Sequence, residues 1–516
     1  MCERVRQTHP QPQSVAKEWY ELYNENIAPK IEERGEQQNK EKTELPENKF
    51  SVPGLFGQFK IFAKRNILSK LADRQYLLIN LLESPLLAFV LAFFVKYFSG
   101  THDNPGEYIF ANNENIPAYL FICVICAMFI GLTVSAEEII RDLKILNRER
   151  FLNLSWTSYI NSKIAVLFGI SAIQTLSFAL VGNFILEIKG LNLEYWLILF
   201  SVSALANMVG LNISSALKSV VNIYILIPFI IVPQLLFSGV LVNFGKMHKS
   251  VASVEYVPLV GDAMPTRWAF EALALAQFKD NEYFKHFFAI EQEISKNNYI
   301  SVFLIPNLEE RINDTKKALK TGGDEREIAR NLGIIKTMVS ELSTSEGERF
   351  DRVNEITPEK FSDNVAYYLN IFLDKVKSEC EDFQYSATEK RDYIFNDMIE
   401  QYGSREAIFE LQEKYHNKKL EEYMLNKNEL EKVLESNGRL IQQKDPAYQI
   451  PRFTNGRAPF YAPVKRLGSL TIDTFWFNTV VIWLITIFFY VALRFTWLKS
   501  LLGFFGRISL KKKLSE

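Results

Sequence analysis

This chain has few cysteines, few histidines and almost no net charge. The 516 residues include four cysteines and five histidines, and 59 basic residues stand against 60 acidic ones, which leaves a net charge of −1. So few cysteines do not build a disulfide framework, and histidines scattered singly do not indicate a metal site. A nearly neutral chain also has no overall attraction to nucleic acid. These shortages argue against disulfide-rich, metal-centred and nucleic-acid-binding proteins.

Nucleotide-binding motifs are missing as well. No G-x-x-x-x-G-K-[ST] phosphate loop occurs, because GLFGQFK at 54–60 does not fit it, and no LSGGQ-like segment occurs. No Ser-His-Asp or paired-carboxylate arrangement indicates a catalytic site. We therefore expect that this chain is not an enzyme, that it binds no cofactor and no metal, and that it has no catalytic residues.

Long apolar runs are what the chain has in abundance. A helix of about 20 apolar residues crosses the hydrocarbon core of a bilayer, and the sequence offers five such spans within 76–243 and a sixth at 473–498. The predicted fold is mainly α: a polytopic membrane protein with six transmembrane helices, an amphipathic connecting helix and a helical extracytoplasmic insertion. We expect a multi-pass protein of the bacterial inner membrane, in contact with membrane lipids.

The Lys and Arg pattern predicts the orientation of the remaining segments, because short cytoplasmic loops are enriched in these residues. Residues 1–49 are expected to be a polar tail or linker, 50–75 the connecting helix, 137–163 a cytoplasmic loop and 499–516 a basic cytoplasmic tail. The spanless block 244–472 is expected outside, with membrane-proximal helices at 244–288 and the helical insertion at 290–445.

Residues 137–163 are the most informative loop. Ile140, Leu143 and Leu146 recur at roughly helical spacing among basic residues, which predicts an amphipathic helix between the second and third spans. Such a helix can transmit a push from a partner at the membrane face. Equally, the loop can be a solvated segment that only satisfies the Lys/Arg rule. Glu83 inside the first span is open to two interpretations too: a transport path or a structural hydrogen bond.

The order of these parts resembles the membrane half of white/G-subfamily ABC transporters, a branch of the type-2 ABC exporters. The loop after the second span matches a pattern of R-E, a gap, then Y-x-x-x-K, and the fifth span ends in FSGVLVN at 237–243, similar to FSGLLVN. The resemblance covers about residues 55–288 and 460–498. It implies a coupling helix at 137–163 with Arg148, Glu149, Tyr159 and Lys163, and an apolar plug made by Val240 and Leu241.

Further site residues are implied by the same resemblance. An aromatic residue in the second span lines the family's cavity, and either Phe129 or Ile130 falls there. Glu137 resembles an acidic residue of a polar network at the inner end of that span, and we expect Glu83 to belong to the same network. Val240 replaces the first Leu of the family's plug, and the large helical insertion has no counterpart in the family's short outer loop.

The resemblance implies an ABC transporter permease that exports an amphipathic or lipid-like substrate. ATP and Mg would bind on a partner ABC ATPase subunit or on a missing N-terminal domain, and a homodimer or paired permease would form the path. A periplasmic partner is expected for the insertion, and no nucleic acid. The alternative is a membrane-anchored interaction or signalling protein whose periplasmic helical domain remains while transport is lost.

Overall fold

The computed structural model describes residues 12–40, 53–98, 100–101, 104–149, 154–345 and 349–504. The chain divides into two compact units, Met1–Gly54 and Leu55–Glu516. The first unit contains helices α2 (Pro12–Asn26) and α3 (Ala28–Lys40), so the stretch expected to be a polar tail is helical in its described part. Of the predicted basic tail 499–516, only 499–504 lie within the described residues.

The second unit is mainly helical. Its α-helices are α4 (Leu55–Ala72), α5 (Arg74–Val95), α6 (Ile116–Ala136), α7 (Glu138–Arg148), α8 (Trp156–Leu186), α9 (Asn192–Ala216), α10 (Val220–Leu236), α11 (Leu259–Asp262), α12 (Pro265–Lys279), α13 (Phe288–Asn298), α14 (Ile305–Thr321), α15 (Glu325–Ser345), α16 (Asp363–Tyr402), α17 (Arg405–Tyr415), α18 (Lys418–Met424) and α19 (Thr474–Arg494). Its strands form three antiparallel pairs: β1 (Gly100–Thr101) with β2 (Asn104–Pro105), β3 (Val433–Ser436) with β4 (Arg439–Gln442), and β5 (Val464–Leu467) with β6 (Leu470–Asp473).

Among the described residues, five helices are long and apolar enough to cross a membrane: α5, α6 together with α7, α8, α9 and α19. The chain is therefore a multi-pass integral membrane protein. The fifth predicted span corresponds to α10, an apolar helix of 17 residues that is shorter than the other five. It ends at Leu236 rather than near 242, because Gly239 adopts a left-handed backbone with φ +80°, which an α-helix does not accommodate.

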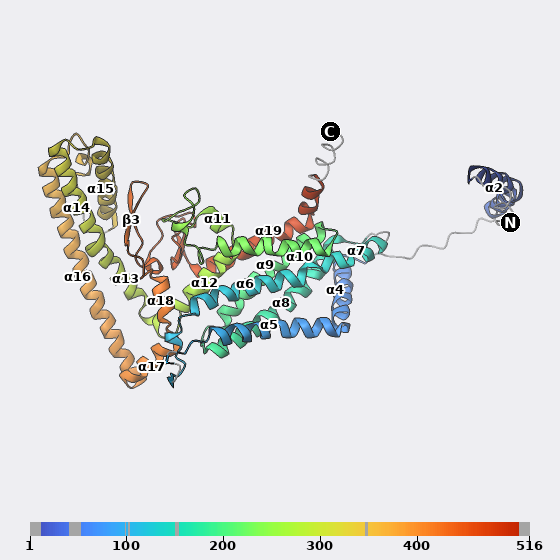
Figure 1. Cartoon of the computed structure of the whole chain (residues 1–516), viewed down its shortest axis with the longest axis horizontal. Helices are drawn as coiled ribbons and strands as arrows, with labels where there is room; N and C mark the ends of the chain where they lie inside the picture. The colour runs from blue at the N-terminus through green and yellow to red at the C-terminus, as the bar shows by residue number, and fades with distance from the viewer. Residues whose placement is uncertain are drawn as a thin grey trace. The chain divides into compact units, whose positions relative to one another are not determined.

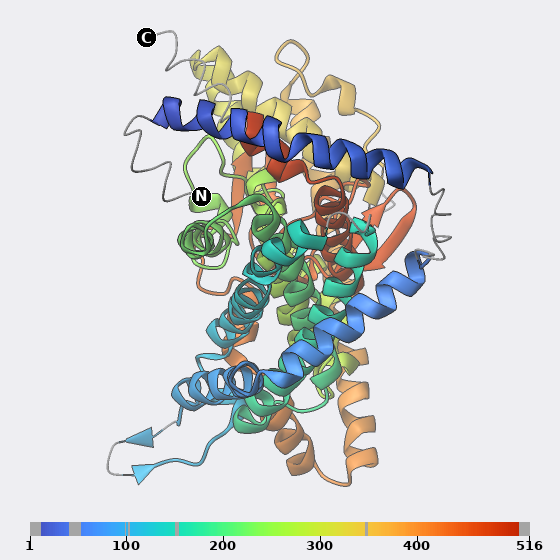
Figure 2. The ribbon, with the colours of Figure 1, turned by 90° about the vertical axis from the view of Figure 1, so that its right-hand side faces the viewer.

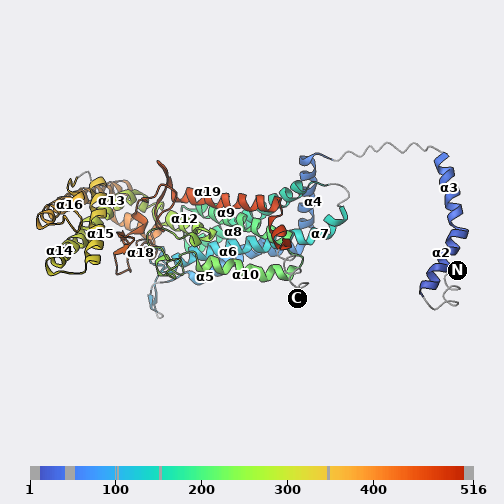
Figure 3. The same ribbon diagram turned by 90° about the horizontal axis from the view of Figure 1, so that it is seen from above.

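Close contact between α6 and α9 forms the centre of the membrane part, where the two helices run alongside each other (Figures 1 and 3). A Cβ atom at Gly131 would lie 2.5 Å from the backbone oxygen of Ser203, and one at Gly210 would lie 3.2 Å from that of Leu132. Only glycine fits at both crossings, and small residues allow membrane helices to approach in this way. At one end of this closely packed pair, α6 leads into α7, and Ser214 of α9 contacts the start of α7.

Helix α4 lies across the ends of the membrane helices rather than parallel to them (Figures 1 and 2). Its exposed side chains include several large apolar residues, as expected of a helix on a membrane surface: Leu55, Phe56, Ile61, Leu68 and Leu71. The opposite end of the membrane helices meets α12 and a helical block, which we define as α13–α18 (288–424). Figures 1 and 3 show α14, α15 and α16 at the far end from α4 and α7.

The predicted helical insertion 290–445 is helical only as far as Met424. Its last part is the hairpin β3–β4, in which Ser436 pairs with Arg439. Asn437 and Gly438 form the turn between them with φ +51° and +72°. An Asn-Gly pair with positive φ at both positions is the favoured two-residue hairpin connection. The helical expectation was therefore wrong at this point, and the local Asn-Gly signal decides the structure.

Candidate functional site

The buried face of α4 repeats every four residues and packs against the first two turns of α8. Residues four apart lie on the same side of a helix, so each contact on α4 meets a contact one turn further along α8. The contacts are the Gln58 side-chain oxygen with the Ser155 amide at 2.8 Å, the Phe62 ring with the Tyr159 ring at 5.7 Å between centroids, and the Asn66 side-chain oxygen with Lys163 Nζ at 3.4 Å. This matched register fixes α4 against α8.

A buried group of charges continues this contact. Glu138, at the start of α7, accepts hydrogen bonds from Lys70 of α4 and from Lys163 of α8, the latter at 3.0 Å. Lys163 also forms a 2.9 Å ion pair with Asp142, to which the Tyr159 hydroxyl donates a hydrogen bond. We call these five residues the α4–α7–α8 charge cluster. Because each charge is paired across a helix boundary, the cluster ties three helices together.

Two predicted residues lie at the edge of this cluster. Glu149 accepts two hydrogen bonds from the Arg65 guanidinium, at 3.1 and 3.2 Å, so its partner is within the chain. Arg148 is exposed, as are Arg141 and Lys144 on the same helix. Positions 141, 144 and 148 share one face of α7. They form a basic stripe on the side that the charge cluster leaves free.

Glu137 belongs to a second polar contact, between the end of α6 and α10. The Tyr224 hydroxyl donates a 2.7 Å hydrogen bond to Glu137, which also pairs with Arg141. The side chain of Ser214, from α9, accepts hydrogen bonds of 3.1 Å from the amides of Ile139 and Ile140, so it satisfies the free amides of the first turn of α7. Among the described residues, no hydrogen bond or ion pair joins Glu83 directly to Glu137.

The expected coupling helix at 137–163 is two helices with a break between them. α7 ends at Arg148, and α8 begins at Trp156 after the N-cap Ser155, whose hydroxyl accepts a 3.3 Å hydrogen bond from the Ser158 amide. Residues 150–153 of the predicted stretch lie outside the described residues. The correction has a physical cause: a Ser at this position offers the helix-start capping that favours a new helix over continuation.

The predicted plug residues follow α10 in an irregular segment, 237–243. Val240 is half-buried and Leu241 is 62% exposed. The Phe244 ring packs against the left-handed Gly239, and its nearest atom would lie 2.3 Å from an added Cβ. From the helical block, the Tyr423 hydroxyl donates a 3.3 Å hydrogen bond to the Val240 backbone oxygen. The segment borders a cavity of about 390 Å³ that Tyr423 and Tyr461 also line.

The two candidates for a cavity-lining residue differ in exposure. Phe129 is 40% exposed on the side of α6, whereas Ile130 is 1% exposed and belongs to the hydrophobic core. A residue that meets a substrate needs an accessible side chain, so only Phe129 is placed for that role. Ile130 packs inside the helix bundle.

Sequence reasoning found Glu149, Tyr159 and Lys163 but missed the residues that bind them, which are Arg65, Asp142 and Glu138. It also missed Lys70, which pairs with Glu138. Local spacing gives a partial signal for Glu138 and Asp142, which are four apart and share one face of α7. The partners on α4 are 68 and 84 residues away from theirs, and no local pattern predicts a contact of that length. Tyr423 was missed for the same reason.

Comparison with known proteins agrees with this arrangement. Residues 57–278 match the family model of ABC-2 type transporters. The chain is also 25% identical over 234 residues to an ABC transporter ATP-binding/permease protein of Mycobacterium tuberculosis. The aligned part covers 43% of this chain and 25% of the length of that relative. The match runs from the first turn of α4 to the last turn of α12, so it contains the whole charge cluster and the 237–243 segment. Residues 57–278 thus resemble the membrane domain of ABC-2 type transporters.

Proposed function

We propose that this chain is the permease component of an ABC exporter, in which the basic stripe on α7 receives an ATPase. The observation that carries the proposal is the α4–α7–α8 charge cluster. It holds α7 against α4 and α8, and Ser214 holds it against α9, while the basic stripe stays exposed. A rigidly seated helix with a free basic face is suited to pass a displacement from a partner to the membrane helices.

Under this proposal ATP and Mg²⁺ bind to the partner ATPase subunit or domain. In ABC-2 type transporters the membrane component normally works with an ATPase component, and the relative from Mycobacterium carries ATP-binding and permease parts in one protein. The contact would be between the basic stripe and an acidic surface of that ATPase. Glu149, Tyr159 and Lys163 would act within this chain, because Arg65, Asp142 and Glu138 already engage them.

The proposal includes six spans, with α10 as the fifth. Its 17 residues lie at the lower limit for crossing the hydrocarbon core. Both ends of the chain, α4 and α7 would then face the cytoplasm of a bacterial inner membrane, and 244–472 would lie outside. The cytoplasmic side is proposed for α7 because of its Arg and Lys residues.

The path itself is proposed to form between two copies. α10 exposes large apolar side chains at Val221, Ile225 and Phe229, and Phe129 of α6 is exposed as well. Lipid covers such faces, and a second permease copy does so equally well. The substrate would be amphipathic or lipid-like, and Val240 with Leu241 would close the path near the helical block.

The experiment uses the membrane-embedded full chain and a candidate ABC ATPase encoded in the same organism. An affinity-tagged chain is purified, the associated proteins are identified by mass spectrometry, and ATP hydrolysis is measured. We expect an ABC ATPase in the purified complex. The Arg65→Glu variant should lower coupled hydrolysis, and the swap Arg65→Glu with Glu149→Arg should restore it, since the pair is internal. If the tagged wild-type chain is present at its normal level in the membrane and purifies without any ABC ATPase, the proposal is contradicted.

A further inference from the structure

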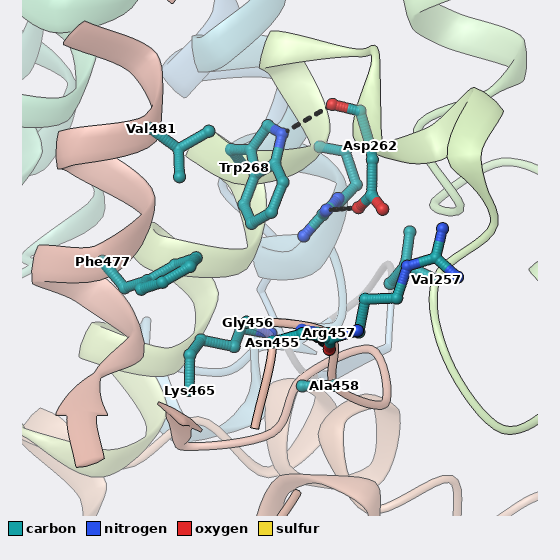
Figure 4. A pocket seen from close by; sticks show the side chains of 11 residues that line it. Val257, Asp262, Trp268, Asn455, Gly456, Arg457, Ala458, Lys465, Phe477 and Val481 are labelled. Atoms are coloured by element: carbon teal, nitrogen blue, oxygen red, sulfur yellow. Dashed lines mark hydrogen bonds and ion pairs between the residues drawn. The ribbon is translucent and has the colours of Figure 1, made fainter. Parts of the chain in front are cut away.

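A second cavity lies away from the 237–243 segment, between the start of α12, the start of α19 and the 455–458 loop. Its volume is about 240 Å³. Figure 4 shows Trp268 and Asp262 on one side of the space and the loop with Arg457 on the other, with Phe477 at the flank. We call it the Arg457 pocket. None of the residues that the resemblance assigns to the coupling helix, the plug, the cavity or the polar network lines it.

The floor beneath the pocket is a buried ionic group centred on Glu271. Glu271 is fully buried and accepts hydrogen bonds from Arg267 at 2.8 Å, Lys465 at 2.7 Å and the Asn478 side chain at 2.8 Å. Burial raises the pKa of Glu271, but the charges of Lys465 and Arg267 outweigh it and hold that pKa below its usual value. Glu271 is therefore ionised, and its charge is neutralised from within the fold.

The remaining charges do not balance. Arg267 also pairs with Asp262, so Arg267 and Lys465 together offset Asp262 and Glu271. Arg457 is then left over: three cations against two carboxylates give one net positive charge at the pocket. No carboxylate of the described residues forms an ion pair with Arg457, whose guanidinium instead lies 4.8 Å from the centre of the Tyr256 ring. The charged groups at the pocket therefore carry one net positive charge.

A buried donor at the pocket is also unused. Arg267 is only 1% exposed and lines the cavity, yet its Nε has no hydrogen-bond partner within the described part of the chain. Buried donors are almost always satisfied, so an unpaired one calls for an acceptor that is missing from the protein alone. An anion with several oxygen atoms meets both needs, because guanidinium groups bind such oxyanions as bidentate donors.

Apart from Asn455, the rest of the lining is apolar. Phe477 and Val481 are one turn apart on α19 and lie within its first two turns, beside Trp268. From Val480 onward α19 also exposes Leu484 and Ile487. Trp side chains favour this depth of a membrane protein. A molecule whose head fills the pocket would thus find an apolar helix face for its tail.

We propose that the Arg457 pocket binds the phosphate headgroup of an anionic lipid whose acyl chains lie along α19. Arg457 and the Nε of Arg267 donate to the phosphate oxygens, and Trp268 and Phe477 contact the adjoining apolar part. A cavity of about 240 Å³ holds a headgroup and not a whole lipid, which leaves the chains outside it. This proposal does not depend on ATP-driven export, since it requires only that α19 crosses the membrane.

The test is lipid binding by the purified full chain in a zwitterionic detergent. Phosphatidic acid, phosphatidylcholine and inorganic phosphate are titrated separately, and binding is followed by native mass spectrometry and by the shift in thermal unfolding. The variants are Arg457→Gln, Arg457→Lys and the control Arg326→Gln, which removes an exposed charge of the helical block. We expect phosphatidic acid to bind the wild type, Arg457→Lys and the control, and about tenfold more weakly to Arg457→Gln, as loss of one charge-assisted contact predicts.

Three results would overturn the proposal. The first is equal binding of phosphatidic acid by Arg457→Gln and the wild type. The second is Arg457-dependent binding of phosphatidylcholine as tight as that of phosphatidic acid, which would remove the requirement for a net negative headgroup. The third is Arg457-dependent binding of inorganic phosphate with no gain from the lipid chains, which would make the pocket a site for free phosphate. Thermal unfolding without lipid shows whether each variant is folded.

Discussion

The Tyr423 hydroxyl donates a 3.3 Å hydrogen bond to the backbone oxygen of Val240. Tyr423 belongs to the helical block and Val240 to the proposed plug, so the two parts of the chain are joined at this point. α18 itself is seated on the segment before α6, because the Asn417 side chain donates hydrogen bonds of 2.8 Å to the backbone oxygens of Phe110 and Asn113. The block is therefore placed to hold the 237–243 segment in its observed conformation.

Tyr423→Phe tests this link. The variant removes one hydroxyl and keeps the ring, which packs 5.7 Å from the Tyr461 ring. A single hydrogen bond contributes about 0.5–1.5 kcal/mol, so the protein should remain folded while the plug loosens. We expect higher basal ATP hydrolysis in the complex with the ATPase. Tyr393→Phe, at an exposed position of α16, is the control. Identical basal rates in wild type and Tyr423→Phe would show that the link does not restrain a gate.

Val240 and Leu241 should respond differently to truncation. Leu241→Ala removes an exposed side chain and should leave the free energy of unfolding within about 0.5 kcal/mol of the wild type, whereas Val240→Ala removes a half-buried one and should cost more. If the two close the path, the double variant raises basal hydrolysis and leakage of a reconstituted amphipathic dye. Unchanged hydrolysis and leakage in a stably folded double variant would remove the plug assignment.

Substitutions of Glu138, in the first turn of α7, and of Glu149, just after its last residue, should differ in their effect on stability. Glu138→Gln leaves Lys70 without its carboxylate and Lys163 with Asp142 alone, and breaking a buried pair costs up to about 3–5 kcal/mol. Glu149→Gln breaks a pair whose partner Arg65 is 42% exposed, which costs about 0–1 kcal/mol. Denaturant unfolding in detergent measures both. Equal costs for the two variants would be inconsistent with the charge cluster as described.

Acid should loosen α18. Burial opposes the ionised form of Glu421, but hydrogen bonds from His416 and Lys427 outweigh it and lower its pKa to about 2. A lowered pKa in the folded state gives stability that is present above the ordinary Glu pKa of 4.5 and is lost as pH falls from 4.5 toward 2. Hydrogen exchange of the α18 amides should therefore show more opening at pH 3 than at pH 7. In Glu421→Gln the difference in α18 opening between pH 3 and pH 7 should be smaller. A difference as large as in the wild type would exclude Glu421 as the cause.

Topology is tested by labelling single cysteines with an impermeant maleimide. Glu410→Cys places a thiol on the exposed surface of the helical block, and Lys144→Cys places one on the basic stripe. The proposed orientation predicts that position 410 is labelled in intact cells and that position 144 is labelled only after the membrane is opened. Labelling of position 410 from the cytoplasmic side alone would reverse the assignment.

Sequence reasoning predicted the parts of the fold whose signal is local. Apolar runs located the membrane helices, although the predicted fifth span included FSGVLVN at 237–243, whereas α10 ends before it at Leu236. It did not predict the ion pair between Glu138 and Lys70, because the packing of α4 on α8 brings these two residues together. It also predicted helix as far as residue 445, although Asn437-Gly438 is a strong hairpin signal. Contacts across long chain distances need the tertiary structure.

The central claim is that the basic stripe on α7 receives an ABC ATPase, and a double charge reversal tests it most directly. Lys144→Glu with Arg148→Glu changes two exposed side chains outside the charge cluster, so folding should be retained. The measurement is ATP hydrolysis by the ATPase copurified with the tagged chain, per mole of chain. We predict that the wild type retains the ATPase and its hydrolysis and that the double variant loses most of both, while Lys317→Glu in the helical block has no effect. Full retention of ATPase and hydrolysis by a folded double variant would contradict the account.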